Sequence, residues 1–149
     1  MNLKRMISTG TDNMSYEESN EPIIWVKEMS EVFTIEQIKN LVQTIHLEDE
    51  RKTRIDMSFS ESNNARIERV FLVEKGHRDG LEIHIVLNDA TIFIINNDSR
   101  KLITILFARP EQIERLYRIC NETSNTNLKP PKKLLAKARI NKEKGRNNL

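Results

Sequence analysis

The chain is poor in several residue types that small proteins use for covalent or metal-based stabilisation. Its 149 residues include one cysteine, Cys120, three histidines and four glycines, and only 5% are aromatic. A single cysteine excludes an intramolecular disulfide, and one cysteine among scattered histidines lacks the spacing of a zinc site. No apolar run reaches the ~18 residues of a membrane span, and the N-terminus has no apolar stretch of signal-peptide length. We therefore expect a soluble, cytoplasmic protein that does not associate with membranes.

The motifs of several enzyme classes are missing too. There is no glycine-rich loop of the kind that holds a phosphate, no acidic cluster spaced for metal binding and no Gly-x-Ser-x-Gly turn. Nucleotide hydrolysis, metal catalysis and acyl transfer therefore lack support in the sequence. We expect neither a metal nor another cofactor.

Charge is plentiful and unevenly distributed. Charged residues make up 31% of the chain and the formal net charge is +2. The segment from Lys129 onward holds eight basic residues and one acidic residue, so it carries +7 and leaves −5 on the rest. A basic tail on a mildly acidic body indicates a polyanion such as RNA, or an acidic protein surface, as the partner. The tail residues that we expect to contact phosphates are Lys132, Lys133, Lys137 and Arg139.

Three regions are predicted along the chain. Residues 1–21 are polar and acidic with little periodicity, which is typical of a disordered arm. Residues 22–121 form a single α+β domain. Residues 122–149 form a basic tail, within which residues 134–146 are either a short basic helix or a segment that orders only on binding.

Two helices are expected at the start of the domain. Thr34 and Gln37 have the spacing of a capping box, and apolar residues then recur on one helical face to about residue 46. A second helix is predicted from residue 63 or 64 to 75, with a strand as the competing interpretation. The apolar patch 23–26 is either an edge strand or a segment that docks on the core.

The core is predicted between residues 81 and 120. Short polar turns separate three strands, 81–88, 91–96 and 101–108, as in an antiparallel meander. In the first strand apolar and polar residues alternate, so we expect one buried and one wet face. The helix that begins at Pro110 carries its apolar residues, Ile113, Leu116, Tyr117 and Cys120, on one face. The fold class is therefore α+β, with two N-terminal helices, a three- to four-stranded antiparallel meander sheet, a C-terminal amphipathic helix packed on it and disordered tails.

A candidate catalytic group lies on the polar face of the first predicted strand. Glu82 and His84 project from the same face, about 7 Å apart along the strand. A histidine of near-neutral pKa beside a carboxylate can move protons, for example when RNA is cleaved by its own 2′-hydroxyl. Arg109 could stabilise the negative charge that develops on the phosphate oxygens. The simpler interpretation is that each of these side chains is a solvated surface residue.

Other basic residues surround this group in the sequence. His77 lies in a glycine-bounded turn and is a further catalytic candidate, with simple exposure as the competing interpretation. Lys75, Arg78 and Lys101 are candidates for binding a nucleic acid backbone.

The order of elements resembles that of a known enzyme superfamily. The segment NNARIERVFLVEKG, followed by strands that end in I-I-N-x-x-x-x-K-L-I-T-I-L, is similar to phage and polymorphic-toxin members of the barnase–EndoU–colicin–RelE superfamily of small metal-independent RNases. The resemblance covers about residues 34–120. It rests on Asn96, Lys101, Leu102, Ile103, Thr104 and Leu106.

This resemblance implies helices before an antiparallel sheet of about four strands, and RNA cleavage by side chains on the sheet face, with Thr104 near the site. The chain departs from the family pattern because the first helix has only His46, at its end, and no His-x-x-x-(Arg/His) pair. Two functions are therefore expected. The first is an RNA-binding and RNA-cleaving protein of phage or toxin type. The second is a non-catalytic phage or prophage accessory protein that binds a host protein or another partner through its basic tail.

Overall fold

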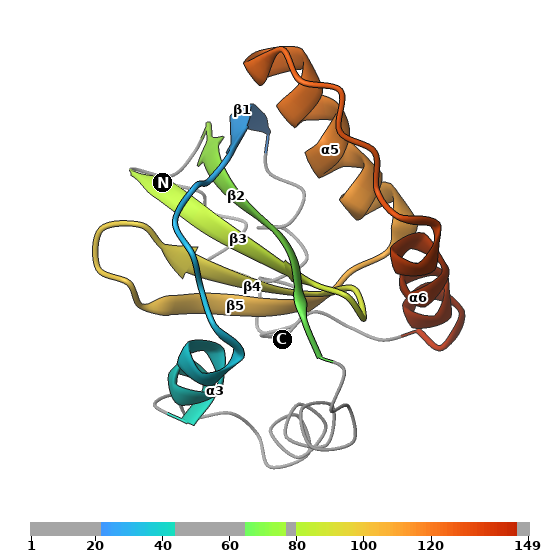
Figure 1. Cartoon of the computed structure of the whole chain (residues 1–149), viewed down its shortest axis with the longest axis horizontal. Helices are drawn as coiled ribbons and strands as arrows, with labels where there is room; N and C mark the ends of the chain where they lie inside the picture. Colours follow the sequence, from blue (N-terminus) through green and yellow to red (C-terminus); the bar gives the residue numbers. More distant parts are fainter. Residues whose placement is uncertain (1–21, 44–64, 77–79, 146–149) are drawn as a thin grey trace, which may run out of the picture.

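The computed structural model of the chain describes residues 22–43, 65–76 and 80–145. In these residues a five-stranded antiparallel sheet, in the order β1-β2-β3-β4-β5, lies between helices on its two faces (Figure 1). The strands are β1 (Ile23–Glu28), β2 (Ile67–Lys75), β3 (Leu81–Leu87), β4 (Thr91–Asn96) and β5 (Leu102–Phe107). The helices are α3 (Ile35–Gln43), α5 (Pro110–Ser124) and α6 (Lys132–Glu143). The predicted α+β class is confirmed.

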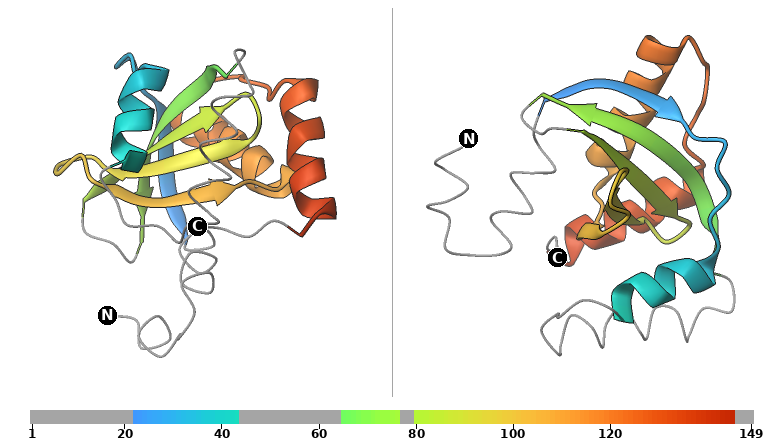
Figure 2. Two further views of the ribbon diagram at one scale, coloured as in Figure 1. Left: turned by 90° about the horizontal axis from the view of Figure 1, so that it is seen from below. Right: turned by 90° about the vertical axis from the view of Figure 1, so that its left-hand side faces the viewer.

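Two hydrophobic clusters, one on each face of the sheet, hold the layers together. Ile38 and Val42 of α3 pack on one face, whereas α5 and α6 pack on the other (Figure 2). Alternate residues of the inner strands enter opposite clusters: in β3, Ile83 and Ile85 face α3 and Val86 faces α5. A strand that is covered on both faces contributes nearly every side chain to a core, so β3 and β4 are almost entirely buried.

Local signals explain where two of the helices begin. The Gln37 amide N–H donates to Thr34 Oγ1 (3.1 Å) and the Thr34 amide N–H donates to Gln37 Oε1 (2.7 Å), which confirms the predicted capping box ahead of α3. Pro110 occupies the first turn of α5, where its missing N–H is harmless. All four predicted apolar residues of α5, from Ile113 to Cys120, are buried.

Three expectations require correction. Residues 67–75 form no helix but the strand β2, the competing interpretation; β2 pairs with β1 and β3, and its side chains are buried alternately against α3 and α5. The sheet accordingly has five strands, and α3 is the one helix that the described residues contain before β2. Finally, β3 has no wet face: Glu82 and His84 are 1% and 4% exposed, because α5 covers them.

A polar contact joins the outer strand β1 to the end of α5. The Val26 amide N–H donates to Thr123 Oγ1 (3.0 Å), and Ser124 Oγ donates to the Val26 carbonyl oxygen (2.7 Å). Backbone groups at a sheet edge are thereby satisfied by helix side chains rather than left to pair with another strand. We call this contact the β1–α5 clasp.

The basic segment expected to be either a short helix or unordered is α6. Leu134 and Ala138 enter the α5-side core, and Asn141 donates to the Ala108 carbonyl oxygen (3.0 Å). The predicted arm, residues 1–21, lies outside the described residues. No helix in the described ranges is long and apolar enough to cross a membrane.

Candidate functional site: a buried Lys–Glu–His cluster

Three ionisable side chains meet on the α5 face of the sheet. Glu82 Oε1 lies 3.4 Å from Lys75 Nζ and 3.0 Å from His84 Nε2. All three side chains are at least 95% buried. We call them the Lys–Glu–His cluster.

Strand register brings the cluster together. Glu82 and His84 are alternate residues of β3, so they point to the same face. Lys75 is the last residue of β2, where Val73 is the Cα partner of Glu82, and it points to that face too. The sequence pattern predicts that Glu82 and His84 share one face, and it offers Lys75 as a nearby candidate. The contact of Lys75 with Glu82 could not be derived from the sequence, because the pattern predicts a helix from residue 63 or 64 to 75 in place of β2.

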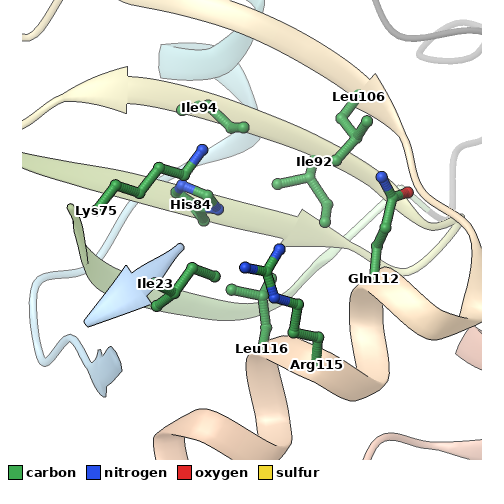
Figure 3. Close-up of a pocket in the computed structure, with 9 residues that line it drawn as sticks. All are labelled: Ile23, Lys75, His84, Ile92, Ile94, Leu106, Gln112, Arg115 and Leu116. Carbon is green, nitrogen blue, oxygen red and sulfur yellow. The ribbon is translucent and has the colours of Figure 1, made fainter. Parts of the chain in front are cut away.

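The helix α5 contributes a third basic side chain. Arg115 extends from α5 toward the sheet and lines a small cavity together with Lys75 and His84 (Figure 3). Gln112, one turn earlier, lines the same cavity. About 20 Å³ of it is open to water-sized molecules, which is room for about one water molecule. The pocket therefore combines three basic side chains and one amide within an otherwise apolar layer, and the Glu82 carboxylate contacts two of the three basic side chains.

Sequence reasoning missed Arg115 and Gln112. A signal was present: residues 112, 115 and 116 are spaced i, i+3 and i+4, so Gln112 and Arg115 share a helical stripe with the buried Leu116. A polar residue on the apolar stripe of a helix indicates a polar feature in the layer that the stripe covers.

Burial lowers the pKa of His84 below its usual value. The hydrogen bond to the Glu82 carboxylate opposes this shift, and the charges of Lys75 and Arg115 reinforce it. His84 is therefore neutral at pH 7. Because the Glu82 carboxylate pairs with Lys75, His84 Nε2 is the donor to Glu82 and Nδ1 is left to accept a proton.

The remaining candidates lie elsewhere. Arg109 is the residue before α5, where its amide donates to Gln112 Oε1 (2.8 Å), and it is not among the cavity-lining residues. Lys101 is exposed in the β4–β5 turn, and Thr104 is two strands from His84 with Ile94 between them. His77 and Arg78 lie outside the described residues.

The tail residues predicted to contact phosphates share one surface. Lys132, Lys133, Lys137 and Arg139 are all exposed on α6, whose opposite side is buried. The acidic residue of α6 is Glu143, at its last position. We call these four residues the α6 basic face. Phosphate backbones bind such surfaces through the release of counterions, whatever the base sequence.

Among the residues that the structure describes, no three His, Cys, Asp or Glu side chains gather as metal ligands do. Comparison of the chain with protein-family models, with curated proteins and with solved structures gives no match. The geometry of the Lys–Glu–His cluster and of α6 is therefore what bears on function.

Proposed function

We propose that this protein binds RNA through the α6 basic face and cleaves it at the Lys–Glu–His cluster without a metal ion. The observation that carries the proposal is the contact of His84 with Glu82 at 3.0 Å beside the buried Lys75, with the half-buried Arg115 lining the same cavity as His84 and Lys75. Buried charges of this kind cost several kcal/mol of desolvation, and perturbed ionisable groups are concentrated at functional sites. The sequence resemblance to metal-independent RNases is a second support for this proposal.

The chemistry follows from the arrangement of donors and acceptors. The 2′-oxygen of a ribose attacks the adjacent phosphorus, its proton passes to Nδ1 of His84, and the bond from phosphorus to the 5′-oxygen breaks. The departing 5′-oxygen takes a proton from the Lys75 ammonium. Glu82 orients the imidazole, and Arg115 stabilises the charge on the phosphate oxygens, the role expected of Arg109.

For this mechanism to operate, RNA must reach the Lys–Glu–His cluster. A cavity with room for about one water molecule does not hold a phosphodiester, so the first turns of α5 must separate from the sheet when RNA binds. The hydrogen bonds of the β1–α5 clasp hold the far end of the helix, at Thr123 and Ser124, whereas apolar packing of Ile113 and Leu116 holds its first turns. Opening of the first turns must therefore break this packing.

The test is incubation of the full chain with total RNA in EDTA, beside His84→Ala and His84→Gln. We expect fragments that end in 2′,3′-cyclic phosphate, and loss of about 10²-fold or more of the rate in both variants. RNA in which the ribose at the cleavage position is 2′-deoxy should stay intact. Thermal melting of each variant separates loss of chemistry from loss of fold.

A second candidate function is favoured because the Lys–Glu–His cluster is buried from solvent. If α5 stays on the sheet, the cluster is inaccessible and α6 alone acts, so the protein is a non-catalytic binder of RNA or of an acidic protein surface. Intact RNA in the presence of folded wild-type protein, together with salt-dependent RNA binding, would support this function and contradict cleavage.

A further inference from the structure

A second pocket lies on the opposite side of the sheet from the Lys–Glu–His cluster. It is bounded by the segment after β1, by α3 and by the turn between β4 and β5, and its volume is about 400 Å³. Sites for small ligands typically measure 300–1,000 Å³. We call it the α3 pocket.

The α3 pocket has an apolar wall and a fixed flat cation. Phe33, Leu41 and Ile95 line it, and the Arg100 guanidinium lies over the Phe33 ring, 6.0 Å from its centroid. Three acceptors hold Arg100 in place: two Glu31 carboxylate oxygens at 2.8 and 3.0 Å, and the Asn97 carbonyl oxygen at 3.0 Å. A bidentate pair fixes the plane of a guanidinium, and such a plane stacks well on flat rings.

The same contacts determine the charge that the pocket accepts. Glu31 compensates Arg100, so a ligand phosphate or carboxylate would have to displace a carboxylate that already uses both Nη atoms. An uncharged ligand meets no such competition.

Amide side chains supply the polar rim. Gln37 and Asn40 line the pocket from successive turns of α3. The oxygen of Gln37 accepts from Thr34, which leaves its NH₂ group to face a ligand. Side-chain amides recognise the hydrogen-bonding edges of planar heterocycles.

We propose that the α3 pocket binds a nucleobase, through stacking on Phe33 and Arg100 and through hydrogen bonds from Gln37 and Asn40. This inference does not depend on RNA cleavage, because the pocket and the cluster lie on different faces of the sheet. The base comes either as a free nucleoside or within an RNA strand.

The test is titration of the full chain, followed by NMR, with the four ribonucleosides, their 5′-monophosphates and a short oligoribonucleotide. We expect saturable shifts of the Arg100 Nε–H signal and of the amides of α3 with at least one nucleoside, or with the oligoribonucleotide if the base is bound within a strand. Phe33→Ala should weaken this binding about tenfold, as loss of a stacking platform does. Arg100→Asn should do the same while keeping the backbone, because asparagine tolerates the positive φ of 62° at this position.

Glu31→Gln tests the charge argument. In this variant Arg100 lacks its carboxylate partner, so the 5′-monophosphate should bind at least several-fold more tightly than the nucleoside. The wild-type protein should show no such preference. The matched control is Glu122→Gln, which breaks an exposed pair with Arg118 (4.0 Å) and should change neither affinity.

Two results would overturn the proposal. One is the absence of saturable shifts with every probe. The other is binding of equal strength in the wild type, Phe33→Ala and Arg100→Asn, which would place the bound base outside the pocket.

Discussion

At the scale of single residues, Glu82 is the carboxylate that pairs with the buried ammonium group of Lys75. It also accepts a hydrogen bond from His84, and all three side chains are buried. We expect Glu82→Gln to reduce the free energy of unfolding by about 3–5 kcal/mol, because it leaves Lys75 buried without its counter-charge. Urea denaturation measures the loss. Glu122→Gln, whose partner Arg118 is exposed, should cost at most about 1 kcal/mol.

Lys75→Met in the Glu82→Gln background should restore part of the stability, because the uncompensated charge is then gone. No recovery in the double variant would mean that the pairing of Lys75 with Glu82 is not what the fold depends on.

His84 gives stability a pH dependence whose direction is fixed. Its pKa is lowered in the folded state, so below the unfolded value of about 6.5 the unfolded chain binds a proton that the folded chain does not. Its contribution is complete above pH 6.5 and is lost as the pH falls. The slope cannot exceed about 1.4 kcal/mol per pH unit for one group. Denaturation at pH 7.5, 6.5 and 5.5 should show this slope in the wild type and a smaller one in His84→Gln.

The burial of Glu82 and His84 could not be predicted from the sequence. Glu82 and His84 look like a wet strand face because polar residues alternate with apolar ones, and alternation does not record what covers the strand. The cover is α5, which begins 26 residues after His84 in the chain. By contrast, the contact between Thr34 and Gln37 spans three residues and was predictable, because both partners lie in one turn.

At the scale of elements, α5 is held to the sheet by its apolar stripe. Leu116 is 4% exposed, and we expect Leu116→Ala to cost about 2–5 kcal/mol and Leu116→Asp to unfold the domain. The neighbouring Glu114 is exposed, so Glu114→Ala should change stability by no more than about 0.5 kcal/mol. Thermal melting compares the variants. A Leu116→Asp protein that melts like the wild type would contradict the packing of α5 on the sheet.

The segment 67–75 shows why one element was predicted wrongly. Its apolar residues are buried toward α3 at some positions and toward α5 at others, so the period of two that marks a half-exposed strand is absent. Good helix caps before it and Gly76 after it then favoured a helix. The outcome was decided by pairing with β1, which ends at residue 28, and with β3, which begins at residue 81.

At the scale of the whole molecule, α6 contributes both to the stability of the fold and to the proposed binding of RNA, and substitutions can separate these two roles. Its inner side completes the α5-side core and its outer side carries the α6 basic face. We expect replacement of the four basic residues by glutamine to leave the melting temperature within about 1–2 °C, because such surface changes rarely matter to stability. The same protein should bind RNA with a salt dependence reduced by up to about 0.7 per lost phosphate contact. Filter binding at several salt concentrations measures this slope.

Leu134→Ala is the complementary change. It should cost about 2–5 kcal/mol while leaving the salt dependence of RNA binding as in the wild type, because Leu134 is 1% exposed and carries no charge. An unchanged salt slope in the glutamine variant would exclude α6 as the RNA-binding surface.

The β1–α5 clasp has a consequence for how the chain is made. Val26 and Thr123 are 97 residues apart, so a ribosome that adds about 5–20 residues per second produces the strand roughly 5–20 seconds before the helix that closes over its edge. During that interval each later strand can pair with its predecessor, because neighbours in the sheet are also neighbours in the sequence. The outer margin of the nascent sheet, however, stays uncovered. Chaperone demand during translation should therefore be set by the wait for residues 110–124 and not by assembly of the meander.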